Sequence, residues 1–310
     1  MGGIKVDVID LFAGMGGLAV GFAREKFSVK GYDINPLSKK IFRINRIGEG
    51  CVRDLSKGCV SGTAEIVTGG PPCRPWSCVN LTRRRCDHPD YGLLDSFFEH
   101  VFEIKPAAFL MENVLPLKSD SKFIMWIERL RESGFSTGYR TIRYSDFGAP
   151  TSRRRLIAVG FADGCSAEEF FLRLEEHRTR PKTVMEAVQQ FIRVKRGDFP
   201  DHEWPELRTI EKYEQYYRTG KYGWYRLDPG RPAPSFGNVM KTYILHPLAK
   251  MNGFPLRVIS VREAMSIMGF DAGFRFPERT GMSVRYQMIA DAVSPVFSQV
   301  CARVMREMLR

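Results

Sequence analysis

Short apolar runs alternate with helical patterns through the first half of the chain, and this alternation limits the possible folds more than any other feature. The runs are rich in β-branched residues and predict strands, whereas the amphipathic stretches between them predict helices. Strands separated by helices indicate an α/β fold, a mostly parallel sheet covered on both faces. The expected strands are residues 4–11, 29–33, 65–68, 107–111 and 156–161, and the expected helices are residues 18–26, 36–45, 93–104 and 123–132.

The pattern changes near Asp163, which suggests a second, smaller domain. From there to about Arg285 the chain is rich in Tyr, Trp, Pro and mixed charge, with few clear periodicities. One helix is predicted inside it, because Ser260 to Glu263 forms a capping box and Gly269 is placed to end the helix. We expect residues 294–309 to form an amphipathic helix that packs back onto the first domain. The predicted domains are residues 1–163 with 284–310, and residues 164–283.

Length, charge and cysteine content narrow the class of protein. The 310 residues carry a formal net charge of +12, which makes nucleic acid the default partner, although charge alone is weak evidence. No stretch approaches the ~20 apolar residues of a membrane helix and no export signal is visible, so we expect an intracellular protein of the cytoplasm or nucleoid, with no membrane partner. The seven cysteines form no Cys-x-x-Cys pair, and their spacing predicts reduced thiols and no metal site.

Polar or glycine-rich groups stand where five of the runs end. Because the carboxyl ends of parallel strands meet at one edge of a sheet, these groups should face one ligand-binding crevice. This convergence is stronger evidence for a site than any single motif. The groups are Phe12 with the glycine turn that follows it, Asp33, Asp54 after a short third run, Pro71-Pro72-Cys73, and Glu112-Asn113.

The glycine turn fits a nucleotide-type cofactor. Gly14, Gly16 and Ala19 match Gly-x-Gly-x-x-Ala, and Asp33 lies near the offset of an acid that binds ribose hydroxyls. This pattern does not separate a nicotinamide cofactor from S-adenosylmethionine. A tight turn that packs a helix on a strand is the simpler alternative.

The segment around Cys73 is more specific. Prolines on both sides restrict the backbone, and a rigidly held cysteine near positive charge is a candidate nucleophile. A lone cysteine is more often a small core residue, but this loop is polar and basic. The arginines at 83–85 either form a solvated face or clamp phosphate.

Glu112 directly follows an apolar run. An acid at the end of a buried strand is partly desolvated, which suits proton donation. The simpler alternatives are a helix cap or a surface salt bridge.

Taken together, these motifs resemble the cytosine C5 DNA methyltransferases of restriction–modification systems. The match is collinear over nearly the whole chain, and only residues 163–250 lack a shared pattern. The matching segments are Asp10 to Gly17, Pro71 to Cys73, Glu112 to Val114, Arg153 to Arg155, Arg257 to Glu263 and Ala290 to Val293. The resemblance implies a Rossmann-like S-adenosylmethionine-dependent methyltransferase domain and a smaller target-recognition domain.

The resemblance also implies catalytic roles. Cys73 would add covalently to C6 of a flipped-out cytosine, because C5 is a poor nucleophile until something adds at C6. Glu112 would contact N3 and the exocyclic amine, Arg155 would hold O2, and Arg153 would support the site. The methyl group would come from S-adenosylmethionine, which leaves S-adenosylhomocysteine as product.

For the cofactor, the resemblance implies a set of residues with some departures from the family pattern. Asp33 stands where the family often has Glu, and Ile34 where it has a larger apolar residue. Thr151 replaces a common Gln, Asp291 replaces the usual Asn, and Asp271 replaces a frequent proline. Asp291 is the departure that puts cofactor affinity most in question. The implied cofactor-binding residues are Phe12, Ala13, Gly14, Gly16, Gly17, Asp33, Ile34, Asp54, Pro71 and Asp291.

For DNA, the resemblance implies that the variable region reads the sequence of a double-stranded target. Its basic residues suit groove and phosphate contact, whereas most of its aromatics favour the core of the small domain. Those aromatics are Trp204, Tyr213, Tyr216, Tyr217, Tyr222 and Trp224. The basic residue Lys221 lies between them in the sequence. The expected DNA-binding residues are Arg74, Ser77, Arg83, Arg84, Arg85, Arg226 and Arg231.

Three alternative functions stay open at this point. A tRNA cytosine methyltransferase uses similar chemistry, but its Cys-Phe-Thr signature is absent from the variable region. An idle DNA-binding relative is disfavoured by the joint presence of Cys73, Glu112 and Arg155, although Asp291 keeps it open. A nicotinamide oxidoreductase leaves the Pro-Pro-Cys loop unexplained. The length favours a stand-alone modification enzyme, and a cognate restriction endonuclease that acts separately is a possible partner.

Overall fold

The structure is a computed structural model that describes residues 6–77, 85–162, 164–206, 210–212, 216 and 224–309. The described residues divide into two compact units. Unit 1 lies within residues 1–143, 154–178 and 298–310, and unit 2 within residues 144–153 and 179–297. These limits differ from the predicted boundaries at 163 and 284, and the separate roles assigned to the two predicted domains stay a prediction.

Unit 1 is built on a sheet that has seven strands in the described part of the chain, in the order β3-β2-β1-β4-β5-β7-β6. The first five strands in this order are parallel, whereas β7 is antiparallel to both of its neighbours. The predicted α/β fold with a mostly parallel sheet is confirmed. The strands are β1 (Val6–Leu11), β2 (Val29–Asp33), β3 (Glu49–Val52), β4 (Ala64–Gly69), β5 (Ala108–Asn113), β6 (Ser136–Arg143) and β7 (Arg154–Phe161).

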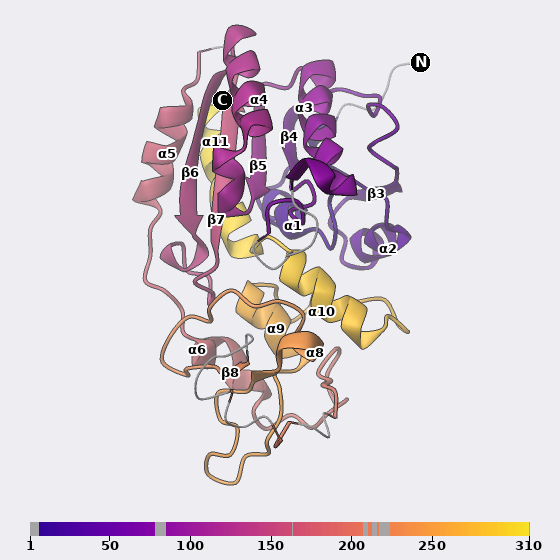
Figure 1. The fold of residues 1–310 in the computed structure, drawn as a ribbon. Coiled ribbons are helices and arrows are strands. Elements are labelled where there is room, and N and C mark those ends of the chain that lie inside the picture. The colour runs from indigo at the N-terminus through magenta and orange to yellow at the C-terminus, as the bar shows by residue number, and fades with distance from the viewer. Residues whose placement is uncertain are drawn as a thin grey trace. The chain divides into compact units, whose positions relative to one another are not determined.

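Helices cover both faces of this sheet, as expected for a doubly wound fold. In Figure 1, α3 (Leu93–Ile104) and α4 (Ser121–Glu132) lie in front of the sheet, and α11 (Pro295–Met308) lies behind it. The front helices build an aromatic core, in which Phe98 stacks on Trp126 with ring centroids 5.5 Å apart.

The C-terminal helix packs against α1 (Gly17–Arg24), as expected for residues 294–309. The Ser298 hydroxyl donates to the Leu18 carbonyl over 2.6 Å. At Gly21 an added Cβ would lie 2.4 Å from the backbone of Ser298, so only glycine allows this close approach.

Several elements of unit 1 match their predicted bounds, and others were not predicted. Strand β2 and helix α3 coincide with the predicted residues, and α2 (Pro36–Ile44) differs by one residue. The edge strand β6 was missed because most of its side chains are partly or fully exposed, and it therefore lacks an apolar run. Helix α5 (Ala167–Glu176), which is capped by Ser166, was missed in the region of unclear periodicity.

Unit 2 consists of short elements. The predicted capping box is confirmed: the Ser260 hydroxyl accepts from the Glu263 amide over 3.0 Å, and Glu263 accepts from the Ser260 amide over 2.7 Å. Gly269 ends this helix in the left-handed region, with φ of 94°. The elements are α6 (Val184–Val188), β8 (Tyr225–Arg226), α8 (Val239–Thr242), β9 (Ile244–Leu245), α9 (Val261–Met268) and α10 (Met282–Asp291).

Among the described helices of both units, none combines the length and apolar character needed to cross a membrane.

Candidate active site

The five parallel strands of unit 1 end at one edge of the sheet. Leu11 at the end of β1 pairs with Tyr32 on one side and with Gly69 on the other, and Gly69 pairs with Met111 of β5. The strand order reverses between β1 and β4, which is the point where open α/β sheets bind ligands. The sequence groups that follow these strands therefore stand at the carboxyl edge of the sheet, and their joint contribution to one ligand-binding crevice stays a prediction.

The glycine turn after β1 is held by Asp33. The Gly14 amide donates to Asp33 Oδ2 and the Asn35 amide to Oδ1, each over 2.8 Å. Burial raises the pKa of Asp33, although both amide bonds oppose the shift. Gly16 has φ of 86°, and a Cβ there would lie 2.8 Å from Ile47, so this position requires glycine. The carboxylate thus fixes the backbone of the turn.

The surroundings of this turn fit a nucleoside cofactor. At Gly14 the nearest atom to an added Cβ would be the Phe12 carbonyl oxygen at 4.0 Å, which leaves the backbone open to a ligand. No side chain caps α1, so the first backbone amides of this helix are not bonded to a cap. They carry the positive end of the helix dipole. Ile34, beside Asp33, is an exposed apolar residue with 66% of its surface accessible. An acceptor suited to hydroxyl groups is thus followed in the chain by an exposed apolar side chain suited to a base.

Asp54, also predicted near the cofactor, lies in the turn after β3. Its carboxylate accepts from the Ser56 amide over 3.1 Å and from the Ser56 hydroxyl over 2.6 Å. These bonds lower the pKa of Asp54. The side chain therefore supports its own turn.

The Pro-Pro-Cys segment is bound to the end of β5. Asn113 donates from Nδ2 to the Pro71 carbonyl over 2.9 Å, and its Oδ1 accepts from the Val114 amide over 2.8 Å. A Cβ added to Gly70 would lie 3.6 Å from the Glu112 carboxylate. Cys73 lies on this segment, and it is partly buried. The candidate nucleophile and the candidate acid therefore belong to adjoining parts of one edge.

Glu112 forms a shielded ion pair with Arg155. Arg155 Nε lies 3.0 Å from Glu112 Oε1, and the two side chains are only 12% and 8% exposed. The pair joins β5 to β7, where Glu112 stands opposite Ile157 in the register. Arg155 also donates from Nη1 to the Arg154 carbonyl over 2.8 Å. A carboxylate held in this way is fixed in orientation.

Three further residues that the sequence motifs singled out, Arg153, Thr151 and Asp291, belong to unit 2. Arg153 is buried, and its carbonyl accepts from the Tyr144 amide over 3.0 Å. The Thr151 hydroxyl donates to the Ala233 carbonyl over 3.1 Å. Asp291, at the end of α10, accepts from Gln287 Nε2 with both carboxylate oxygens, at 3.1 and 3.0 Å.

The predicted DNA contacts are only partly described. Arg74 is exposed and lies 3.8 Å from Asp90, and the Ser77 amide donates to the Arg74 carbonyl over 3.4 Å. In unit 2, Arg231 is exposed and lies 3.4 Å from Asp228, and Arg226 donates to the Ala249 carbonyl over 3.4 Å. Arg83, Arg84 and the side chain of Arg85 lie outside the described residues.

The described aromatics of the variable region pack within unit 2. Trp224 stacks on Tyr243 with ring centroids 4.8 Å apart, and Tyr216 meets Trp224 edge-on at 5.3 Å. The Arg257 guanidinium lies 4.3 Å from the Trp204 ring centroid. These contacts favour the interpretation that Trp204, Tyr216 and Trp224 belong to the core of the small domain. Tyr213, Tyr217, Lys221 and Tyr222 lie outside the described residues.

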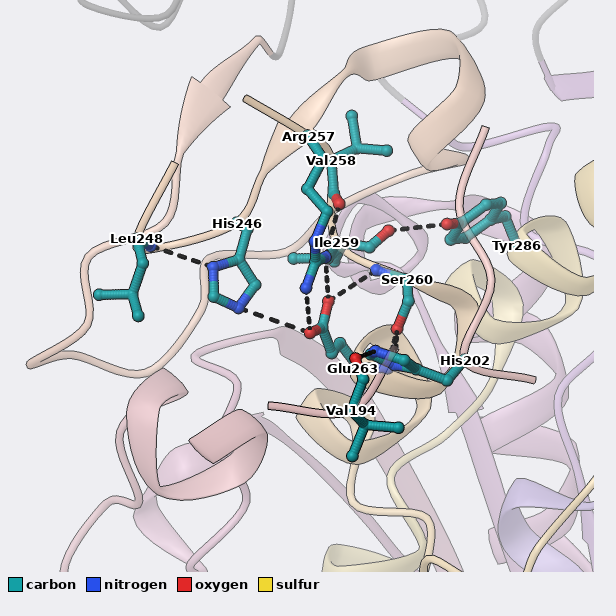
Figure 2. A network of polar contacts seen from close by, with 10 residues as sticks. All are labelled: Val194, His202, His246, Leu248, Arg257, Val258, Ile259, Ser260, Glu263 and Tyr286. Atoms are coloured by element: carbon teal, nitrogen blue, oxygen red, sulfur yellow. Dashed lines mark hydrogen bonds and ion pairs between the residues drawn. The ribbon is translucent and has the colours of Figure 1, made fainter. Parts of the chain in front are cut away.

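A buried polar network centres on Glu263 (Figure 2). Arg257 donates to both of its oxygens, over 2.7 and 2.8 Å, and His246 Nε2 lies 3.4 Å away. The Ser260 hydroxyl lies 3.0 Å from Nδ1 of His202, whose Nε2 faces the Val194 carbonyl. This network links the segment from Arg257 to Glu263 to the rest of unit 2.

Sequence reasoning assigned no individual role to several residues that shape the site. Asp10, inside β1, is buried and accepts from the Thr68 hydroxyl over 2.8 Å, and burial raises its pKa to about 7. Trp76 and Asp120 are hydrogen-bonded over 2.8 Å, although they are 44 residues apart. No pattern in the sequence indicated that these two residues meet.

Comparison with known proteins identifies the family. A model of the C-5 cytosine-specific DNA methylases matches residues 6–307. The chain belongs to this family. Its relatives include the type II methyltransferase M.XorII of Xanthomonas oryzae pv. oryzae, which is 31% identical over 233 residues, 69% of this chain and 50% of the relative. They also include the type II methyltransferase M1.HphI of Haemophilus parahaemolyticus, which is 27% identical over 340 aligned positions, 98% of this chain and 88% of the relative.

The matched part of the chain thus spans only half the length of the Xanthomonas protein. Solved structures share the fold over almost the whole chain. A candidate DNA modification methyltransferase from an E. coli prophage superposes with a TM-score of 0.73 at 22% identity, covering 98% of this chain and 99% of its own. The S. pombe Dnmt2 methyltransferase gives a TM-score of 0.72 at 14% identity and covers 98% of both chains.

Proposed function

We propose that this protein transfers a methyl group from S-adenosylmethionine to C5 of a cytosine in double-stranded DNA, through a covalent bond between Cys73 and C6. Membership of the family supports the reaction class. The observation that carries the mechanism is the junction of the Pro-Pro-Cys segment with the end of β5. There Asn113 holds the Pro71 carbonyl, and the neighbouring Glu112 is paired with Arg155.

In this mechanism the protein activates the base. The Cys73 thiolate adds to C6, and electron density shifts to C5, while Glu112 contacts N3 and the exocyclic amine. Arg155, already fixed to Glu112, binds O2 and stabilises the charge of the adduct, with Arg153 supporting the site. C5 then accepts the methyl group and loses its proton, and expulsion of Cys73 restores the aromatic ring. A paired base is out of reach, so the cytosine must leave the duplex.

S-adenosylmethionine would bind at the glycine turn, where it supplies an electrophilic methyl group. Asp33 would accept hydrogen bonds from the ribose, Ile34 would cover the adenine, and the start of α1 would attract the cofactor's carboxylate. Phe12, Ala13, Gly17, Asp54, Pro71 and Asp291 complete the proposed set. S-adenosylhomocysteine would be the product.

Unit 2 would read the DNA sequence, with Arg226 and Arg231 on the duplex and Arg74 and Ser77 near the flipped base. The excess of basic residues predicts affinity that falls steeply with salt, because phosphate contacts release counterions. Relatives named type II methyltransferases suggest a modification enzyme that protects DNA from a separate restriction endonuclease.

The test uses duplexes that carry 5-fluorocytosine, with S-adenosylmethionine added. Fluorine cannot leave as a proton does, so the adduct should persist and survive denaturation. We expect wild-type protein to be trapped and Cys73→Ala to remain free, whereas Cys86→Ala, which removes another thiol in unit 1, should be trapped like wild type.

Two other outcomes would overturn the proposal. DNA binding without any adduct on long mixed-sequence duplexes would support an idle relative. An adduct on RNA alone would make the protein a tRNA-type enzyme.

A further inference from the structure

Asp120 is a buried carboxylate that holds two aromatic side chains from distant parts of the sequence. Trp76 donates from Nε1 to Oδ2 over 2.8 Å, and the Tyr91 hydroxyl donates to Oδ1 over 3.1 Å. The Lys122 amide also donates to Oδ1, over 3.0 Å, so Asp120 caps α4 as well. Asp120 is 2% exposed and Trp76 is 5% exposed, so water does not compete for the Trp76 bond.

The Trp76 end of this cluster is joined to Cys73 by one turn. The Trp76 amide donates to the Cys73 carbonyl over 3.0 Å. On the other side of Cys73, the Pro71 carbonyl accepts from Asn113. Asn113 and Asp120 are connected by a single 3₁₀ turn, Leu115–Ser119. The short segment from the last residue of β5 to Asp120 therefore holds the chain on both sides of the cysteine.

Tyr91 brings a further part of the chain to the same carboxylate. Its ring lies 5.6 Å from the Trp76 ring, and the Lys122 ammonium lies 4.2 Å from its centroid. Burial, together with the bond to Asp120, raises the pKa of Tyr91 to about 12. The phenol therefore keeps its proton at neutral pH and remains a donor.

We propose that Asp120, Trp76 and Tyr91 form a clamp that positions the Cys73 thiol for its attack on C6. The inference rests on the proposed function, since holding Cys73 in place matters for the reaction only if Cys73 is the nucleophile. The three are positioning residues, because they act through the backbone of Cys73. Nothing in the sequence motifs assigns them this role.

The test compares two tryptophans in similar settings. Trp76→Phe keeps a buried ring but removes the donor to Asp120. Trp126→Phe is the matched control, because Trp126 is also 5% exposed and donates from Nε1 to a carboxylate, Asp95 Oδ1, over 2.7 Å. We expect kcat of Trp76→Phe to fall about tenfold, with KM for DNA and cofactor within about twofold of wild type. Trp126→Phe should lose thermal stability to a similar degree and keep its kcat.

A second readout does not depend on methylation. The rate at which iodoacetamide alkylates Cys73, followed by peptide mass spectrometry, should rise in Trp76→Phe and stay unchanged in Trp126→Phe. Tyr91→Phe should shift both readouts in the same direction but less, because Asp120 keeps its bond to Trp76.

The outcomes distinguish a failure of the clamp proposal from a failure of the proposed methyltransferase function. Equal kcat and equal alkylation rates in the two tryptophan variants would overturn the clamp, even if wild type methylates DNA. If wild type neither methylates nor is trapped by DNA, the proposed function fails, and the alkylation rates alone decide the clamp. Unequal rates would then support it and equal rates would reject it.

Discussion

Arg155 Nε lies 3.0 Å from Glu112 Oε1, and this ion pair bridges two antiparallel strands of an otherwise parallel sheet. The reversed direction of β7 is what allows the pairing. Arg155 enters β7 at the edge where β5 ends, so a residue near the start of one strand meets a residue near the end of the other. The two candidate catalytic side chains are therefore fixed by the sheet itself.

Replacing Arg155 by Ala should abolish most activity. The change leaves the Glu112 carboxylate buried without its ion-pair partner and removes the proposed ligand of O2, so kcat/KM should fall at least about a hundredfold. Arg140→Ala is the control, because Arg140 stands in β6 of the same sheet and pairs with Glu168 at the surface. It should change kcat/KM by less than about twofold. Similar losses in both variants would contradict the assigned role.

Asn113→Ala should weaken both stability and rate. The Pro71 carbonyl and the Val114 amide would each lose a buried partner, which costs about 1–3 kcal/mol of unfolding free energy. Because Pro71 lies two residues from Cys73, the rate of adduct formation on 5-fluorocytosine DNA should also fall. Urea unfolding and single-turnover kinetics measure the two effects. A stability loss with an unchanged adduct rate would show that Asn113 is structural only.

Asp33→Asn should raise KM for S-adenosylmethionine about tenfold while kcat at saturating cofactor changes little, because an amide offers one acceptor where the carboxylate offers two. Asp7→Asn is the matched control. Asp7 also links β1 to the β2 segment, since its carboxylate accepts from the Ser28 amide over 2.7 Å, but it does so at the opposite end of the strands. A raised KM for S-adenosylmethionine in both variants would indicate a general disturbance of the sheet and not the loss of a ribose contact.

Acid should destabilise unit 2 through its buried histidines. Burial lowers the pKa of His202 and of His246 below 6.5, so the folded chain binds fewer protons than the unfolded chain as the pH falls. Their contribution to stability is therefore present above the unfolded pKa of about 6.5 and is lost below it. Urea unfolding between about pH 7.5 and about pH 5.5 measures this loss. His202→Gln, which cannot titrate, should lose less stability than wild type over that range, and equal slopes would refute the argument.

The elements that the sequence predicted are those with a strong local signal. Strand β2 contains Val29 and Tyr32 and ends in Asp33, and α9 is marked by a capping box and a terminal glycine. The bounds of α9 are set by contacts within a few residues, whereas β2 also pairs with β1 and β3, and both elements were predicted. Strand β6 has no such signal, because at the edge of a sheet its side chains need not be apolar. It becomes a strand only because β7 offers it a partner.

In the candidate site, too, the features that could be predicted are local in the sequence, and those that could not depend on contacts between distant segments. The roles of Cys73, Glu112 and Arg155 were predicted from the resemblance of the motifs that contain them, since each motif is a short local pattern in the sequence. The contacts of Trp76 with Asp120, and of Asn113 with Pro71, depend on segments about 40 residues apart in the chain. Which distant donor meets which acceptor is set by the packing of the whole sheet and its helices. For that reason the candidate reacting groups could be predicted from the amino-acid sequence, whereas the side chains that hold them are identified only in the folded chain.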